Sequence, residues 1–181
     1  DPRFMQDEVT YKQGAVAKMG ELLGKEELGR LLQAEAYDEI IEQIRKVAAS
    51  TNLLYLSTPN TGDLRILVAP GLDKAAFCRE FANLLYGDGS GEQRLESYLG
   101  WVVSASLPNQ WTFPTYFLFF ASPQSEFFVK PSVISWWLAY LGAPQSYSTK
   151  PTLDLYVTLK DIAHALYEML TPFGPRDMID I

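Results

Sequence analysis

The chain has 181 residues, of which 48% are hydrophobic and 20% are charged, a composition that suits one folded domain and excludes a disordered protein. Fifteen lysines and arginines against 22 aspartates and glutamates give a net charge of -7, which opposes non-specific binding to nucleic acid. One cysteine, Cys78, and one histidine, His164, exclude an internal disulfide and leave a zinc site short of its usual ligands.

The first third of the chain has helical periodicity. Apolar residues recur every three or four positions over 7–24, where Gly24 is the expected stop, and a shorter amphipathic helix is expected over 25–34. A third apolar stripe predicts a helix that ends before Ser50. Residues 53–68 fit either a short β-hairpin or an interhelical loop. We favour the loop, because an isolated two-stranded ribbon is only marginally stable.

Helical signals continue through the middle of the chain. Asp73 can cap a helix that runs through Tyr86, and Ser90 begins another that ends before Pro108. The most apolar segment, residues 113–121, is far shorter than a membrane span and therefore predicts a buried core helix.

The last part of the chain is also predicted to be helical. Pro131 opens a helix that ends near Leu141, and a polar loop then leads to a long helix over 152–170. A turn over 171–175 precedes the start of a further helix that the sequence does not complete. The chain is therefore expected to be truncated at its C-terminus.

These elements predict an all-α fold. Residues 1–181 are expected to form a single irregular multihelical domain with, at most, a short β-hairpin around residues 53–68. No segment has the length of a transmembrane helix and no signal segment opens the chain. The expected location is the cytoplasm, with no membrane partner.

No motif identifies an enzyme, a metal site or a cofactor site. Phosphate-binding glycine loops, nucleophile elbows and paired histidines are absent from the sequence. The glycine-rich run at 87–91 contains one acidic residue and is interpreted as a connecting loop. His164 has no evident catalytic partner, and Cys78 is expected in the core. We therefore assign no catalytic residue, metal or cofactor, and we favour a protein without enzymatic activity.

Two basic residues stand beside prolines at predicted helix starts. Lys130 and Arg176 could each place a positive side chain near exposed backbone N–H groups, an arrangement that favours a phosphate or carboxylate. The alternative is structural. Lys130 would then cover neighbouring phenylalanine side chains, and Arg176 would pair with Asp177 or Asp180.

Aromatic residues provide the second candidate surface. Trp111, Trp136 and Tyr140 are candidates for an exposed surface that binds a protein partner. Trp136 and Trp137 are adjacent, so on a helix they point about 100° apart, and one of them is expected in the core.

Several short motifs resemble an uncharacterised family of bacterial proteins. They are Asp1–Phe4, Thr51–Leu54, Leu84–Gly87, Trp111–Thr115, Phe128–Pro131 and Gly174–Ile181. The resemblance extends over nearly the whole chain and implies a bacterial origin but no activity. A weaker similarity of layout links the chain to the C-terminal part of helix-hairpin-helix glycosylases. The sequence lacks their Gly-apolar-Gly hairpin and catalytic residue, so their reaction is not implied.

Two functions follow as hypotheses. The first is a non-catalytic helical binding module of a bacterial cytoplasmic protein, whose partner is another protein or the remainder of a longer chain. The alternative is a DNA-binding or nucleic-acid-processing domain related in layout to helix-hairpin-helix proteins, although the net charge disfavours it.

Overall fold

The computed structural model describes residues 9–56, 62–140, 142 and 148–181, and their regular secondary structure is helical, with no β-strand. The α-helices are α2 (Tyr11–Leu23), α3 (Lys25–Gln33), α4 (Tyr37–Ala48), α5 (Lys74–Tyr86), α6 (Gly91–Ser104), α7 (Thr112–Ala121), α8 (Pro131–Tyr140) and α9 (Leu153–Leu170). Two short 3₁₀ helices are η2 (Arg65–Val68) and η3 (Thr171–Phe173). The predicted all-α class is confirmed.

Local sequence signals explain where several helices begin and end. The side chain of Ser90 accepts a hydrogen bond from the backbone of Gln93, whose own side chain accepts one from the Ser90 backbone. Asp73 caps α5 in the predicted manner. Gly24 separates α2 from α3, where a Cβ atom would collide with a carbonyl oxygen one turn earlier. These polar and glycine residues therefore set where one helix ends and the next begins.

The region 53–68 forms a loop and the 3₁₀ helix η2 in its described part, as the favoured alternative predicted. Residues 57–61 lie outside the described residues. Leu54, Ile66 and Leu67 are buried, which explains the apolar runs that had also suggested a hairpin.

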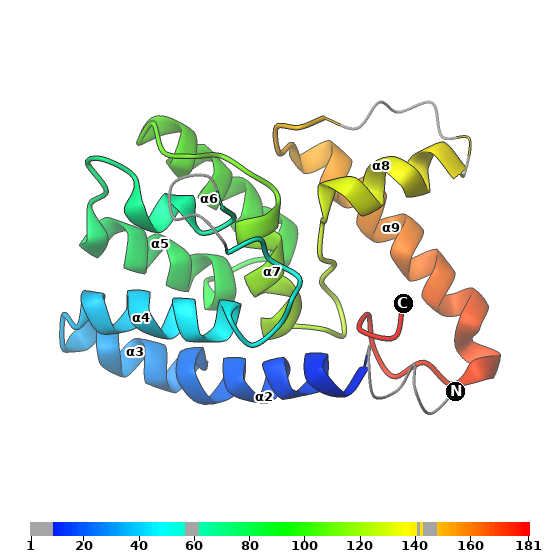
Figure 1. Ribbon diagram of the computed structural model, residues 1–181, viewed down its shortest axis with the longest axis horizontal. Coiled ribbons are helices and arrows are strands. Elements are labelled where there is room, and N and C mark those ends of the chain that lie inside the picture. Colours follow the sequence, from blue (N-terminus) through cyan, green and yellow to red (C-terminus); the bar gives the residue numbers. More distant parts are fainter. Residues whose placement is uncertain (1–8, 57–61, 141, 143–147) are drawn as a thin grey trace.

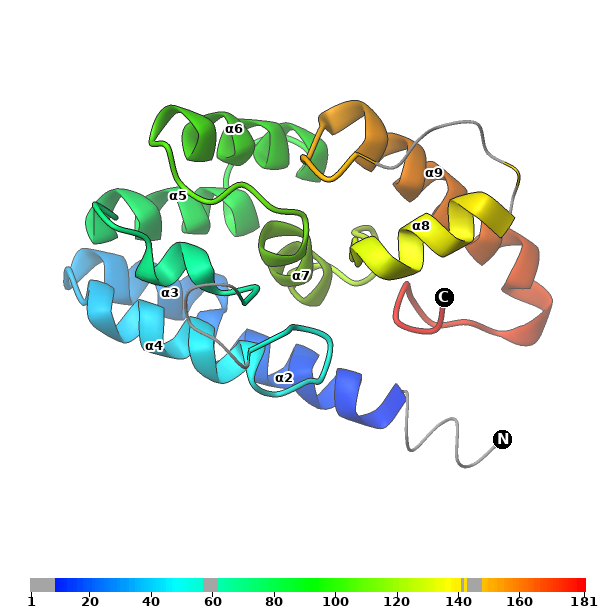
Figure 2. The same cartoon turned by 45° about the horizontal axis from the view of Figure 1, so that its top comes forward.

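Helix α7 lies at the centre of the molecule (Figures 1 and 2). Helix α2 packs against α3, α4 and α7, while α5 packs against α6 and α7. Helix α9 packs against α6, and together with α8 it forms the other side of the molecule (Figure 1). All residues from Thr112 to Phe120 are buried, as predicted for a core helix. Among the described residues, no helix is long and apolar enough to cross a bilayer.

The centre of the core is aromatic. The ring of Phe117 lies 5.1 Å from that of Phe81 in an edge-on arrangement, and 5.0 Å from that of Phe113. Tyr116 also contacts Phe117, and its hydroxyl donates a hydrogen bond to the carbonyl oxygen of Val47 at 3.2 Å. The cluster of rings therefore joins α5 to α7, and the hydroxyl of Tyr116 joins α7 to α4.

The chain after η3 differs from the prediction. Residues 174–181 contain a short turn over 177–179 and no helix, so the expected final helix is wrong. The backbone N–H and the guanidinium of Arg176 both donate to the carboxylate of Asp180, which closes a turn. The backbone N–H of Met178 donates to the carbonyl oxygen of Pro123 at 2.9 Å, and the Met178 side chain is buried. Contacts with the segment after α7 thus replace helical hydrogen bonds.

Candidate functional site

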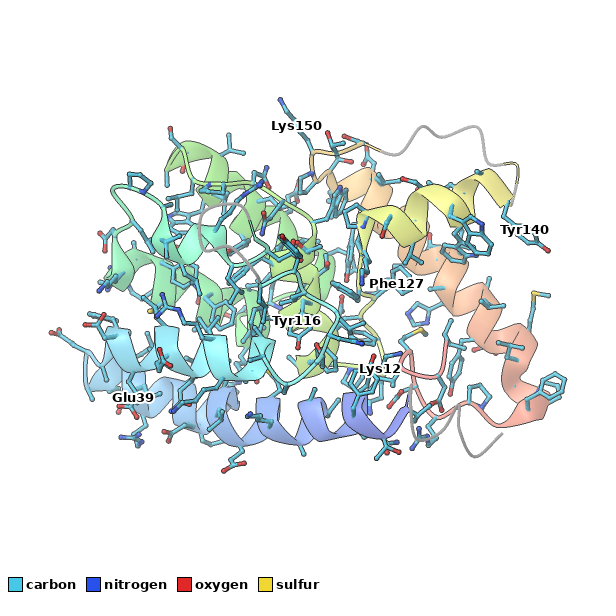
Figure 3. All side chains as sticks on the ribbon, viewed as in Figure 1. Lys12, Glu39, Tyr116, Phe127, Tyr140 and Lys150 are labelled. Atoms are coloured by element: carbon cyan, nitrogen blue, oxygen red, sulfur yellow. The ribbon has the colours of Figure 1, made fainter. Side chains whose placement is uncertain are left out.

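Helix α8 has one buried and one exposed side. Ile134 and Leu138 are buried, whereas Val133, Trp136 and Tyr140 are 51%, 66% and 76% exposed. We call these three exposed residues the α8 aromatic face. The rings of Trp136 and Tyr140 stack with centroids 5.6 Å apart and an interplanar angle of 15°. Figure 3 shows Tyr140 at the outer end of α8.

Helical geometry separates the two adjacent tryptophans. Trp137 packs against the core and lies 6.1 Å from the ring of Phe127, whereas Trp136 points to solvent. The predicted exposure of Trp136 and Tyr140 is therefore confirmed. A stacked pair of large exposed aromatic side chains is typical of surfaces that bind a partner.

Trp111 does not belong to this surface. Its side chain is buried, and its indole N–H donates to the carbonyl oxygen of Ser148 at 2.8 Å. The prediction that Trp111 contributes to a partner surface is wrong, because Trp111 directly precedes the buried helix α7 and is enclosed with it.

The two residues predicted to bind an anion, Lys130 and Arg176, differ in their contacts. Lys130 immediately precedes α8, and its carbonyl oxygen accepts the N–H groups of Val133 and Ile134. The guanidinium of Arg176 is bound by Asp180, with Nη2 to Oδ1 at 2.9 Å and Nε to Oδ2 at 3.0 Å. The structural alternative for Arg176 is thus confirmed. Its charge has an acidic partner within the chain, which weakens the case for a joint anion site.

A buried ionic cluster joins α6, α9 and the segment between α7 and α8. Glu126 is only 3% exposed, and its carboxylate accepts hydrogen bonds from Lys160 at 3.1 Å and from Tyr156 at 2.8 Å. Lys160 also binds Glu92 at the start of α6. We call these four residues the Glu126 cluster. No motif in the sequence predicts any of them.

The neighbouring residues fit closely around the Glu126 cluster. A Cβ atom at Gly91 would overlap the Glu126 carboxylate, so the glycine-rich run has a packing role at this position. The Nε2 atom of His164 lies 3.0 Å from the carbonyl oxygen of Ser125 and donates to it, since a carbonyl oxygen only accepts. His164 therefore helps to hold α9 against the same segment.

The Glu126 cluster has the electrostatics of a structural site. Burial, followed by the nearby charge of Glu126, raises the pKa of Tyr156 well above its ordinary value, so its hydroxyl stays protonated and donates. Lys160 is shared by two carboxylates, which offsets the cost of burying its charge. The polar groups bind one another, and we infer that the cluster fixes the position of α9.

Acidification is expected to weaken this site. Burial alone would raise the pKa of Glu92, but hydrogen bonds from Lys160 and Ser90 outweigh it and lower the pKa from 4.5 to about 2. Between these values the unfolded chain is protonated at this position and the folded chain is not, so stability falls as the pH falls. Urea denaturation of wild type and Glu92→Gln should therefore show a stability difference that shrinks below about pH 4.5. A difference that is independent of pH would contradict this assignment.

Cys78 is not a reactive thiol. It is buried, and burial followed by the charge of Asp38 raises its pKa to about 12. The thiol therefore stays protonated at neutral pH, as expected of a core residue. Among the described residues, no group of three or more histidine, cysteine, aspartate or glutamate side chains could hold a metal ion.

Comparison with protein-family models, curated proteins and solved structures finds no match. The resemblance to a bacterial family and the similarity of layout to helix-hairpin-helix proteins stay predictions. Function must therefore be inferred from the residues of this chain.

Proposed function

We propose that this chain is a non-catalytic helical binding module of the bacterial cytoplasm, which binds a protein partner through the α8 aromatic face. The observation that carries the proposal is the stacked, exposed pair Trp136 and Tyr140. Tryptophan and tyrosine supply large contact areas and are enriched among the residues that dominate binding energy. Because the two rings are already stacked on each other, they lose less side-chain freedom on binding than two separate exposed rings would.

Local charge suggests the chemistry of the partner. The segment 127–153 contains Lys130 and Lys150 but no acidic residue, although the chain as a whole has a net charge of -7. Lys130 immediately precedes α8, three positions before Val133 of the aromatic face. A segment with apolar anchors and flanking acidic residues would match this surface in both respects.

The double variant Trp136→Ser/Tyr140→Ser is expected to lose partner binding while remaining folded. Both side chains are exposed, so the free energy of unfolding should change by less than about 1 kcal/mol. A photo-reactive amino acid at Val133 should give a cross-linked adduct in cells, identified by mass spectrometry, that disappears in the double variant. Val103 is an exposed valine on α6 and is the matched control position.

Two results would contradict the proposal. Identical adducts at Val133 and Val103 would show that the cross-linking is non-specific. A large loss of stability in the double variant would show that the α8 aromatic face supports the fold.

The DNA-binding alternative is tested by fluorescence anisotropy with a labelled duplex. Binding at low salt that falls steeply as salt increases would favour that alternative.

A further inference from the structure

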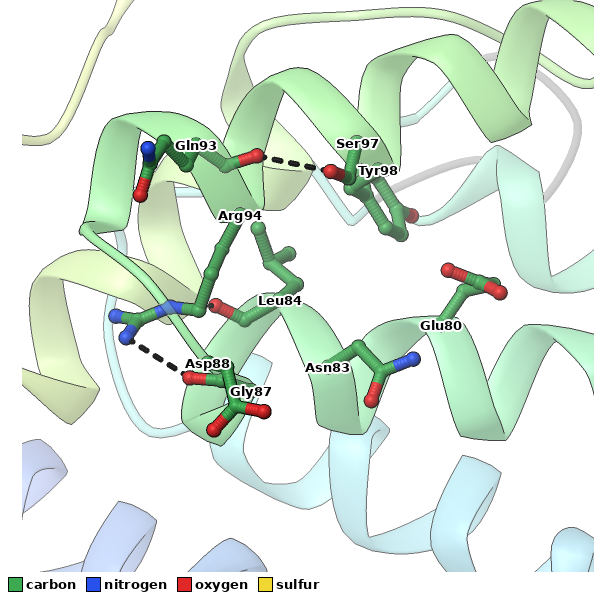
Figure 4. Close-up of a pocket in the computed structure, with 9 residues that line it drawn as sticks. All are labelled: Glu80, Asn83, Leu84, Gly87, Asp88, Gln93, Arg94, Ser97 and Tyr98. Carbon is green, nitrogen blue, oxygen red and sulfur yellow. Dashed lines mark hydrogen bonds between the residues drawn. The ribbon is translucent and has the colours of Figure 1, made fainter.

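A polar pocket lies between α5 and α6, separate from the α8 aromatic face. Its volume is about 230 Å³, and Figure 4 shows the side chains that line it. Glu80 and Asn83 come from α5, Ser97 and Tyr98 come from α6, and Asp88 lies in the connection between them. The pocket is smaller than a typical drug-sized site, so its dimensions suit a single functional group with a short stem.

The acidic groups dominate the charge available to a ligand. The one arginine of the lining, Arg94, donates to the carbonyl oxygens of Leu84 at 3.1 Å and Gly89 at 3.2 Å. These carbonyl groups lie at and just beyond the C-terminal end of α5, where a positive charge is stabilising. The guanidinium of Arg94 is thus already paired with carbonyl oxygens at the end of α5. Glu80 and Asp88, in contrast, present carboxylates to the pocket.

Tyr98 provides an independent observation that points to a ligand. Its side chain is only 2% exposed, and its hydroxyl has no hydrogen-bond partner among the described residues. Figure 4 shows this hydroxyl on the side of the pocket that faces Glu80. Unpaired buried hydroxyl groups are rare in native proteins because they destabilise the fold. A bound group that pairs with this hydroxyl would remove that cost.

We propose that the pocket binds a guanidinium group, through Glu80, Asn83 and the hydroxyl of Tyr98. A guanidinium is planar and carries five N–H donors, which suits several oxygen acceptors arranged around one small space. It is also more weakly hydrated than an ammonium group, so it enters a partly closed pocket at lower cost. The hydroxyl of Ser97 donates to the carbonyl oxygen of Gln93 and keeps a lone pair for the ligand.

The ligand could be a free small molecule or an arginine side chain of a peptide. Isothermal titration with agmatine and with the blocked peptide acetyl-Gly-Arg-Gly-amide distinguishes these sources by which probe binds more tightly. Glu80→Gln should weaken binding of the better probe by about tenfold or more, because it removes a charge-assisted hydrogen bond. Glu96→Gln removes an exposed carboxylate from α6 outside the pocket and should change binding less than about twofold.

Tyr98→Phe gives the most specific result. It should weaken binding of the same probe, yet raise the melting temperature of the free protein by a few degrees, because it removes an unpaired buried hydroxyl. A lower melting temperature in Tyr98→Phe would overturn the proposal by showing that the hydroxyl is already paired. Absence of saturable binding of both probes up to about 10 mM would also overturn it. Equal losses of probe affinity in Glu80→Gln and Glu96→Gln would show that the probe is held by general charge attraction, and this result would likewise overturn the proposal.

Discussion

Replacing Lys160 by methionine is expected to lower the free energy of unfolding by about 3 to 5 kcal/mol, measured by urea denaturation. The substitution keeps most of the side-chain volume but leaves the carboxylate of Glu126, which is almost completely buried, without its positive partner. Glu92 loses the same partner. Removing one member of a buried ion pair costs far more than the pair contributes, because the other charge stays buried.

Lys74→Met is the matched control for Lys160→Met. Lys74 pairs with Asp38 at 2.5 Å, but both side chains are exposed, so the loss should be below about 1 kcal/mol. The double variant Lys160→Met/Glu126→Gln should regain part of the stability, because it removes the unpaired charge. Equal losses for Lys160→Met and Lys74→Met would show that the Glu126 cluster contributes little.

Phe117→Ala is expected to cost about 3 to 5 kcal/mol of unfolding free energy, measured in the same way. Phe117 is completely buried and contacts the rings of Phe81, Phe113 and Tyr116. Its removal leaves a cavity among rings from α5 and α7 that the rigid helices cannot fill.

Phe173→Ala is the control for this core substitution. Phe173 lies in η3 and is largely exposed, so its replacement should change stability by less than about 0.5 kcal/mol. A loss at Phe117 no greater than at Phe173 would mean that the aromatic cluster does not carry the core. The two pairs of variants together compare an ionic and an apolar source of stability within one fold.

Helix positions could be predicted because their signals are local. Asp73 and Ser90 cap α5 and α6 with atoms only three residues away, and the apolar run of α7 needs no information from elsewhere. The C-terminal turn could not be predicted with the same success. The peptide group of Met178 binds Pro123, more than fifty positions earlier in the chain.

The candidate sites depended on distant contacts and were predicted less well. Trp111 and Trp136 have the same side chain, and only their places relative to α7 and α8 make one buried and the other exposed. The Glu126 cluster combines side chains from positions 92, 126, 156 and 160. A single sequence contains many charges but does not indicate which of them meet.

The close approach of Gly91 to Glu126 links two positions that are 35 residues apart, as their numbers show. Because the carboxylate occupies the space that a Cβ atom would need, a larger residue at position 91 requires either that the Glu126 carboxylate leave its buried hydrogen bonds or that position 126 carry a smaller side chain. In any set of related sequences, we therefore expect these two positions to vary together, with glycine at one accompanying the acid at the other.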